Sequence, residues 1–159
     1  MKNNKARSKL RLVLWNRRVS EDIVDNIGSY IKDSNYNVGL VINESPHGMV
    51  DLSSIGMIGY GSTNVKSRGL CFYLSSALRN YVNIYHSTWC IYGTISLPKV
   101  GKLEPVVLGF VATYRSPNLS TDENLEFFND LEGCVSKLLL KSTSVCVMGD
   151  MNANDRRFC

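Results

Sequence analysis

The sequence lacks the marks of membrane, secreted and repetitive proteins. No apolar run approaches the roughly 20 residues that a membrane-spanning helix needs. The start is basic, but no apolar segment follows it to complete a secretory signal. There is no internal repeat or low-complexity block, and a chain of 159 residues with 44% hydrophobic and 20% charged residues is typical of one globular domain. We therefore expect an intracellular protein, cytoplasmic or nuclear, with no membrane partner.

The cysteines show no recognisable spacing. They are odd in number, and none stands in a C-x-x-C pair. This predicts neither a disulfide framework nor a zinc site, and it favours a reducing compartment. Cys146 lies within the apolar run Val145–Met148, so we expect it to be a small buried residue. The five are Cys71, Cys90, Cys134, Cys146 and Cys159.

Positive charge is concentrated at the N-terminus. The chain has 18 basic and 14 acidic residues, a net charge of +4. Seven of the basic residues precede Glu21, the first acid, which leaves 11 basic against 14 acidic residues, or −3, in the remainder. A basic arm suits nucleic acid or another polyanion, and a solvated tail explains the charge equally well. We take residues 1–9 as the arm and 10–159 as the domain.

The order of helical and extended patterns predicts a mixed α/β protein. Ser20 precedes a helical pattern that continues to Ile31. Ser120 and Glu123 have capping-box spacing, and apolar residues at 125, 128, 131, 135, 138 and 139 keep a helical period behind them. β-branched and aromatic runs predict strands at Leu10–Trp15, Val38–Ile42, Met57–Tyr60, Gly69–Ser75, Trp89–Leu97, Val106–Tyr114 and Ser144–Met148.

Two acids stand just past apolar strands. Glu44 comes just after Val38–Ile42, and Asp150 just after Val145–Met148. Sites in α/β sheets form beyond the carboxyl ends of strands, so the two carboxylates could converge on one hard divalent cation. For either acid taken alone, an unrelated exposed loop position is the better interpretation.

Other polar residues also stand at strand ends. Asn16 follows the first strand, Tyr114 and Arg115 end the strand from Val106, and Asn152 lies two residues past Asp150. Amides, a phenol and a guanidinium are the donors that phosphate recognition uses. Each of them is individually common at turns and strand ends. Together with Glu44 they place polar residues at four strand ends, which is harder to attribute to chance.

The order of these motifs resembles the endonuclease/exonuclease/phosphatase superfamily, which includes pancreatic-type deoxyribonuclease and the apurinic/apyrimidinic endonucleases. The resemblance covers residues 11–154 and is nearest to the endonuclease domain of non-long-terminal-repeat retrotransposons, where a reverse transcriptase follows. It implies two mixed β-sheets packed face to face and flanked by helices, as in deoxyribonuclease. The motifs are Trp15-Asn16, Leu40–Ser45, Gly69–Ser76, Val111–Pro117 and Met148–Ala153, with Leu125–Leu131 in support.

The resemblance also implies roles for individual residues. Glu44 matches the acidic ligand of Mg²⁺ or Mn²⁺, and Asp150 the acid that helps to align or activate the attacking water. Asn16 and Asn152 match amides near the scissile phosphate, and Tyr114 a phenol near it. The implied activity is metal-dependent hydrolysis of a nucleic-acid phosphodiester, with DNA favoured over RNA. The residues expected to contact the nucleic acid are Arg17, Arg18, Arg115 and Asn152.

The sequence departs from the family near its C-terminus. The family has further strands there and a late Asp-His pair that serves acid/base catalysis, whereas the histidines of this chain are His47 and His86. We therefore expect an incomplete domain that lacks C-terminal strands and binds nucleic acid but cleaves it slowly or not at all. Two alternatives stay open: an inactive nucleic-acid-binding remnant, and a phosphodiesterase or phosphatase for a small or lipid phosphate.

Overall fold

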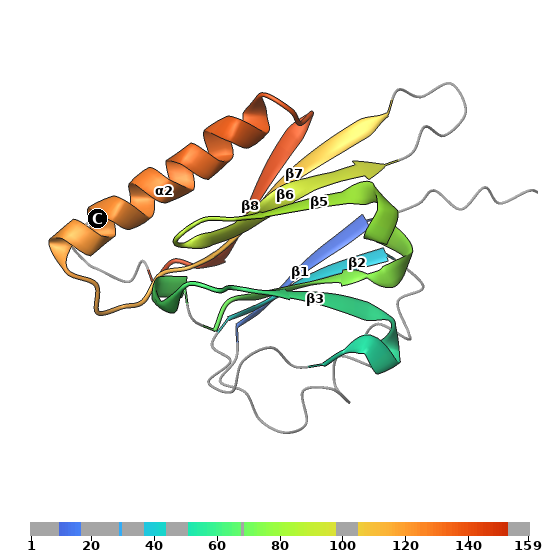
Figure 1. Cartoon of the computed structure of the whole chain (residues 1–159), viewed down its shortest axis with the longest axis horizontal. Coiled ribbons are helices and arrows are strands. Elements are labelled where there is room, and N and C mark those ends of the chain that lie inside the picture. The colour runs from blue at the N-terminus through green and yellow to red at the C-terminus, as the bar shows by residue number, and fades with distance from the viewer. Residues whose placement is uncertain are drawn as a thin grey trace, which may run out of the picture.

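The described part of the chain folds into two four-stranded β-sheets with a long helix beside the second, an α+β architecture (Figure 1). The computed structural model describes residues 10–16, 29, 37–43, 51–67, 69–97 and 105–152. Several predicted features lie outside these residues: the arm 1–9, the helix expected from Ser20 to Ile31, and the side chains of Arg17, Arg18, Glu44 and His47. None of the described helices is long and apolar enough to cross a bilayer.

The first sheet has the strand order β1-β2-β4-β3. β1 and β2 run parallel, with Asn16 opposite Asn43, and the other neighbours are antiparallel. Short 3₁₀ helices lie next to β3 and β4: η1 (Ser53–Ile55), η2 (Val65–Ser67) and η3 (Ser76–Tyr81). The strands are β1 (Leu10–Asn16), β2 (Asn37–Asn43), β3 (Met57–Gly61) and β4 (Cys71–Ser75).

The second sheet has the order β5-β6-β7-β8, and only its last pair, β7 with β8, is parallel. A parallel pair needs a crossover connection, which the helix α2 (Thr121–Leu139) supplies. The strands are β5 (Val82–His86), β6 (Cys90–Leu97), β7 (Val106–Tyr114) and β8 (Ser144–Asp150).

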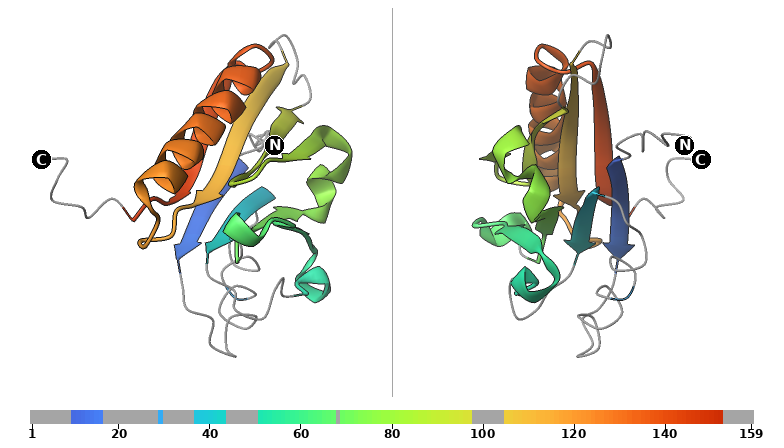
Figure 2. Two further views of the ribbon diagram at one scale, coloured as in Figure 1. Left: turned by 60° about the vertical axis from the view of Figure 1, so that its left-hand side comes forward. Right: turned by 90° about the vertical axis from the view of Figure 1, so that its right-hand side faces the viewer.

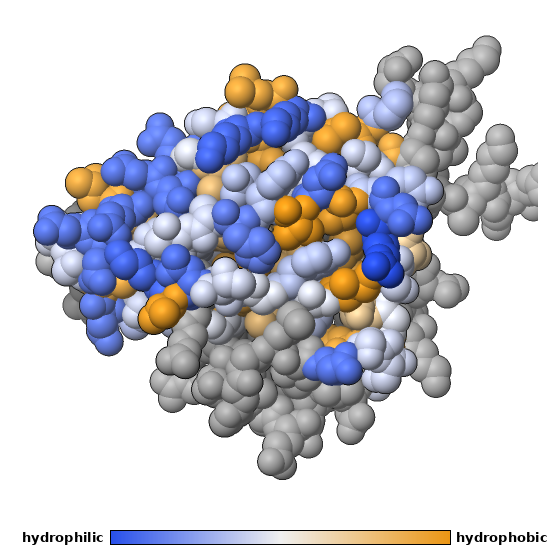
Figure 3. Space-filling model, viewed as in Figure 1, coloured by the Kyte–Doolittle hydropathy of each residue, from blue (hydrophilic) through white to orange (hydrophobic). Residues whose placement is uncertain are grey.

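The two sheets pack face to face over an aromatic and aliphatic core. Phe72 of β4 stacks on Phe110 of β7 with ring centroids 4.3 Å apart, and both side chains are fully buried. Leu74, Ile91 and Ala112 belong to the same buried cluster. The prediction of two packed sheets is therefore confirmed. Figure 3 shows hydrophilic side chains over much of α2 and hydrophobic ones gathered over β5.

The helix α2 begins where the sequence predicts. The N–H of Glu123 donates to Ser120 Oγ at 3.2 Å, and the N–H of Ser120 donates to Glu123 Oε2 at 3.0 Å, so the capping box is confirmed. Its buried face differs from the predicted one. Leu125 and Phe128 are at least half exposed, at 63% and 50%, and Leu139 is also exposed. The side chains that α2 buries most deeply are Phe127, Cys134 and Leu138.

Further predictions need correction in detail. β5 and the 3₁₀ helices were not predicted, and His86 is the last residue of β5. β4 and β6 begin at Cys71 and Cys90, later than expected, because the residues before them form turns. Cys146 is half-buried, since β8 forms an edge of the described sheet.

The parallel strand pairs end on one side of the molecule. Figure 2 shows the arrowheads of β1, β2 and β7 pointing the same way, and β8 runs parallel to β7. β8 also contacts both β1 and β2 of the other sheet. The carboxyl ends of these four strands therefore form a common rim.

Candidate functional site

The end of β7 and the end of β8 lie side by side at this rim. The parallel register pairs Tyr114 with Asp150, and the N–H of Arg115 donates to the carbonyl oxygen of Asp150 at 2.9 Å. Tyr114 is 9% exposed and packs into the inter-sheet cluster, while Asp150 is half-buried. The structure thus brings together the predicted site residues that follow β7 and β8.

Gly149 permits this close pairing. A Cβ atom at residue 149 would lie 1.9 Å from the backbone oxygen of Thr113. Real Cβ atoms do not approach an oxygen so closely, so any other residue would push β8 away from β7. Residue 149 is therefore a glycine for a steric reason: a side chain there would collide with the backbone of Thr113.

Asn152 fastens the turn that follows β8. Its φ of 43° is left-handed, a conformation that asparagine adopts more readily than most residues. Its backbone N–H donates to Asp150 Oδ1 at 2.9 Å, and its side-chain Nδ2 donates to the carbonyl oxygen of Arg115 at 2.6 Å. The backbone N–H of Asn152 therefore orients the Asp150 carboxylate, and its side-chain amide holds the end of β7.

Arg115 is buried and bonded on several sides, with 9% of its surface exposed. Its Nε donates to Asn124 Oδ1 at 2.7 Å, and its Nη1 donates to the carbonyl oxygens of Met151 and Asn152 at 3.1 Å. These bonds join β7, the start of α2 and the segment after β8. The structure gives Arg115 a positioning role that was not predicted, and its contact with nucleic acid stays a prediction.

The first sheet contributes backbone positions to the rim. Asn16 and Asn43 are register partners at the ends of β1 and β2. Glu44 is the next residue after Asn43 and lies outside the described residues, as do Arg17 and Arg18. The convergence of Glu44 with Asp150 therefore stays a prediction.

His86 lies far from Asp150. Its register partner on β6 is Ile91, which pairs in turn with Ala112 of β7 and then with Met148 of β8. Three strand spacings of about 4.8 Å place the backbone of His86 roughly 14 Å from that of Met148. His86 is exposed at the opposite edge of the sheet, so it does not act on a group held at Asp150.

A second polar cluster was not predicted. Potential ligand atoms of Cys90, Asp130 and Cys134 all lie within 4.8 Å of one another, and they form the one such group of His, Cys, Asp and Glu side chains in the described part of the chain. The hydrogen bond between the two thiols lowers the pKa of Cys134 to about 7 and raises the pKa of Cys90. The cysteines are far apart in the sequence, so spacing gave no signal for this cluster.

Comparison of the chain with family models, curated proteins and solved structures found no match.

Proposed function

We propose that the protein is a metal-dependent nuclease that hydrolyses phosphodiester bonds of nucleic acid at the rim formed by β1, β2, β7 and β8. The observation that carries the proposal is the pairing of Tyr114 with Asp150 at the ends of parallel strands. Asn152 holds the pair in place through hydrogen bonds with Asp150 and with Arg115, the residue after Tyr114. The two packed sheets agree with a deoxyribonuclease-like fold, which is part of the proposal.

The carboxylate of Asp150 suits a hard cation at this rim. It is half-buried at a strand end and oriented by the N–H of Asn152. Asp150 and Glu44 would hold Mg²⁺, which when bound supplies a positive charge that stabilises the developing charge on the phosphoryl oxygens. A carboxylate oxygen of Asp150 would orient the attacking water, and the phenol of Tyr114 and the amides of Asn16 and Asn152 would donate to the phosphate.

Nicking of supercoiled plasmid tests the proposal. Neither His47 nor His86 matches the family's late histidine, and loss of a general acid or base typically costs a factor of about 10²–10⁴. We therefore expect slow nicking, measured with protein in excess and long incubation, that requires Mg²⁺ and stops with EDTA. Glu44→Gln should weaken Mg²⁺ binding in calorimetry, because the amide lacks the charge of the carboxylate.

Asp150→Asn should lower nicking to background. The asparagine keeps an oxygen that accepts the N–H of Asn152, so the turn after β8 is preserved. Asp122→Asn, at an exposed position in the first turn of α2, is the matched control and should nick at the wild-type rate. DNA binding without nicking would favour the binding-only alternative, and hydrolysis of a small phosphodiester alone would favour the phosphodiesterase. Absence of both binding and hydrolysis would refute the proposal.

A further inference from the structure

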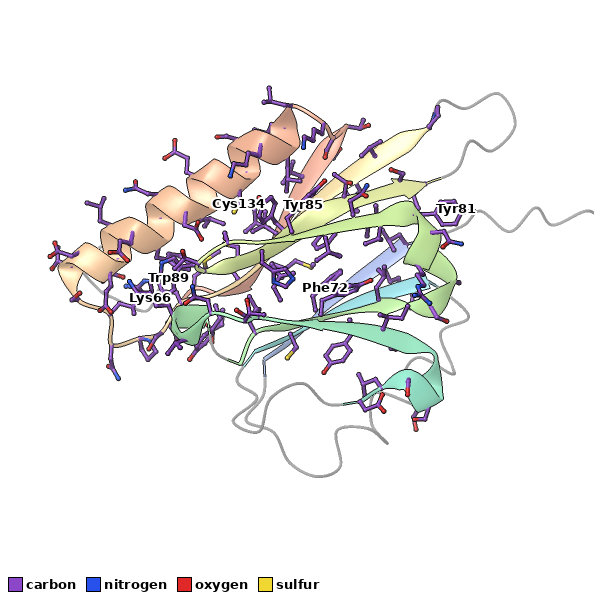
Figure 4. The ribbon with its side chains drawn as sticks, in the orientation of Figure 1. Lys66, Phe72, Tyr81, Tyr85, Trp89 and Cys134 are labelled. Atoms are coloured by element: carbon purple, nitrogen blue, oxygen red, sulfur yellow. The ribbon has the colours of Figure 1, made fainter. Side chains whose placement is uncertain are left out.

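The second polar cluster joins α2 to the turn between β5 and β6. Cys90 is the first residue of β6, while Asp130 and Cys134 are one helical turn apart on the same face of α2. Figure 4 shows Cys134 on the side of α2 that faces the sheet. Both cysteines are 1% exposed, and Asp130 is half-buried. Three potential ligands therefore reach one point from two packed elements.

The spacing of these ligands is close to that of a tetrahedral zinc site. Zn–S bonds of about 2.3 Å and Zn–O bonds of about 2.0–2.2 Å place ligand atoms roughly 3.4–3.8 Å apart. The ligand atoms of Cys90, Asp130 and Cys134 lie within 4.8 Å of one another, so shifts of about 1 Å suffice. Ser87 Oγ stands beside them, 3.4 Å from Cys134 Sγ and 2.7 Å from Asp130 Oδ2.

The carboxylate of Asp130 lies in surroundings that favour a cation. Its Oδ2 accepts hydrogen bonds from Ser87 Oγ and from the backbone N–H of Trp89, a residue of the buried cluster that includes Phe127 and Leu138. The ion pair among the described residues is Lys66–Glu126, so Asp130 forms none with the lysines and arginines described there. A partly buried carboxylate gains stability when a positive charge approaches it.

We propose that Cys90, Asp130 and Cys134 bind a zinc ion, with Ser87 Oγ or a water as the fourth ligand. Thiolates select a soft or borderline ion over Mg²⁺, and a closed set of side chains on two elements is typical of a structural site. Binding replaces the protons of the two thiols with one Zn²⁺, and the ion fastens α2 to the second sheet.

This site is separate from the proposed nuclease site. Cys90 pairs with Thr113, and its Sγ donates to Thr113 Oγ1 at 3.5 Å. Successive side chains of a strand point to opposite faces, so Thr113 faces α2 while Tyr114 belongs to the inter-sheet core. Zinc binding can therefore be tested without any measurement of nicking.

Titration of the reduced, metal-free full chain with Co²⁺ is the primary test, because cobalt–thiolate bonds give a near-ultraviolet charge-transfer band. We expect one Co²⁺ per chain with that band, displacement by Zn²⁺, and no displacement by Mg²⁺. The chain has two tryptophans, so Trp15→Phe leaves Trp89, whose backbone N–H donates to Asp130, as the reporter. Co²⁺ should quench its fluorescence. These measurements need no change to the ligands, and absence of the band would overturn the proposal.

Serine variants assign the ligands. Cys90→Ser and Cys134→Ser should each weaken Co²⁺ binding at least about 100-fold. Loss of a residue that only hydrogen-bonds to a metal ligand weakens binding about 10- to 100-fold, so a larger effect identifies a ligand. Cys146→Ser, at a half-buried cysteine of β8, is the matched control and should bind as the wild type does. Zn²⁺ at a hundredfold above Kd should raise the Tm of the wild type by about 5 °C or more. Equal weakening in Cys146→Ser would overturn the assignment.

Discussion

The rim and the cysteine cluster are built in different ways. At the rim, backbone groups position the side chains. The carbonyl of Arg115 and the N–H of Asn152 form hydrogen bonds there, and Gly149 lets β8 approach Thr113 closely. In the cluster, side chains bond to side chains, as Ser87 does with Asp130 and Cys134. A site made from strand ends is visible in a sequence, whereas a site made by packing a helix on a turn is not.

Disturbing the backbone contact at the rim should have the largest effect on stability. Gly149→Ala should destabilise the fold by about 3 kcal/mol, because its Cβ would meet the backbone oxygen of Thr113 at 1.9 Å. Gly133→Ala is the control: a Cβ there meets nothing within 4 Å, and alanine in a helix should stabilise by about 0.5–1 kcal/mol. Urea unfolding measures both, and equal effects would contradict the steric argument.

Loss of the buried guanidinium tests the bracing of the rim. Arg115→Met removes the bonds to Asn124 Oδ1 and to the carbonyls of Met151 and Asn152, leaving partly buried acceptors without their donor. We expect a loss of about 2 kcal/mol in the free energy of unfolding. Arg79→Met, at an exposed position of η3, should stay within about 0.5 kcal/mol of the wild type. A small effect at Arg115 would mean that the rim does not depend on it.

Replacing Glu123 at the start of α2 should have the smallest effect on stability, and that effect should depend on pH. Hydrogen bonds from the backbone N–H and hydroxyl of Ser120 lower the pKa of Glu123 below its usual 4.5. A folded-state pKa below the unfolded one contributes stability that is present above the unfolded pKa and lost as pH falls through the folded pKa. Glu123→Gln should therefore flatten the decline of Tm below about pH 4.5. Glu132→Gln, farther along α2, should retain the wild-type slope, and identical slopes in all three proteins would contradict the assignment.

Local patterns predicted much of the fold. Runs of β-branched and aromatic residues located all strands but β5, and the spacing of Ser120 and Glu123 located the start of α2. β5 was missed because Val82–His86 is short: its apolar residues alternate with polar ones as in an edge strand, but over five residues the pattern is weak. The buried face of α2 was partly wrong because the pattern cannot tell whether Phe127 or Phe128 turns inward, and packing on the sheet decides for Phe127.

In the candidate sites, too, local patterns predicted some features and missed those that depend on residues far apart in the sequence. Tyr114, Asp150 and Asn152 were predicted to lie together because each stands at or just after a strand end, and the structure brings them together. The positioning role of Arg115 was missed because its acceptors are carbonyl groups 36 and 37 residues away. The cysteine cluster was missed for a similar reason, since Ser87 and Asp130 are 43 residues apart.

The crossover from β7 through α2 to β8 has a consequence for how the chain folds. The β7–β8 pair joins Leu108 to Ser144 across the whole of α2, so its contacts close a long loop, whereas the β5–β6 hairpin joins His86 to Ile91 across a short turn. The two sheets pack where β4 meets β7 through Phe72 and Phe110 and where β8 contacts β1 and β2. Because short loops cost less entropy to close, we expect the β5–β6 hairpin to form early and β8 to pair with β7 later. Hydrogen exchange during refolding should accordingly protect the amide hydrogens of β5 and β6 before those of β8.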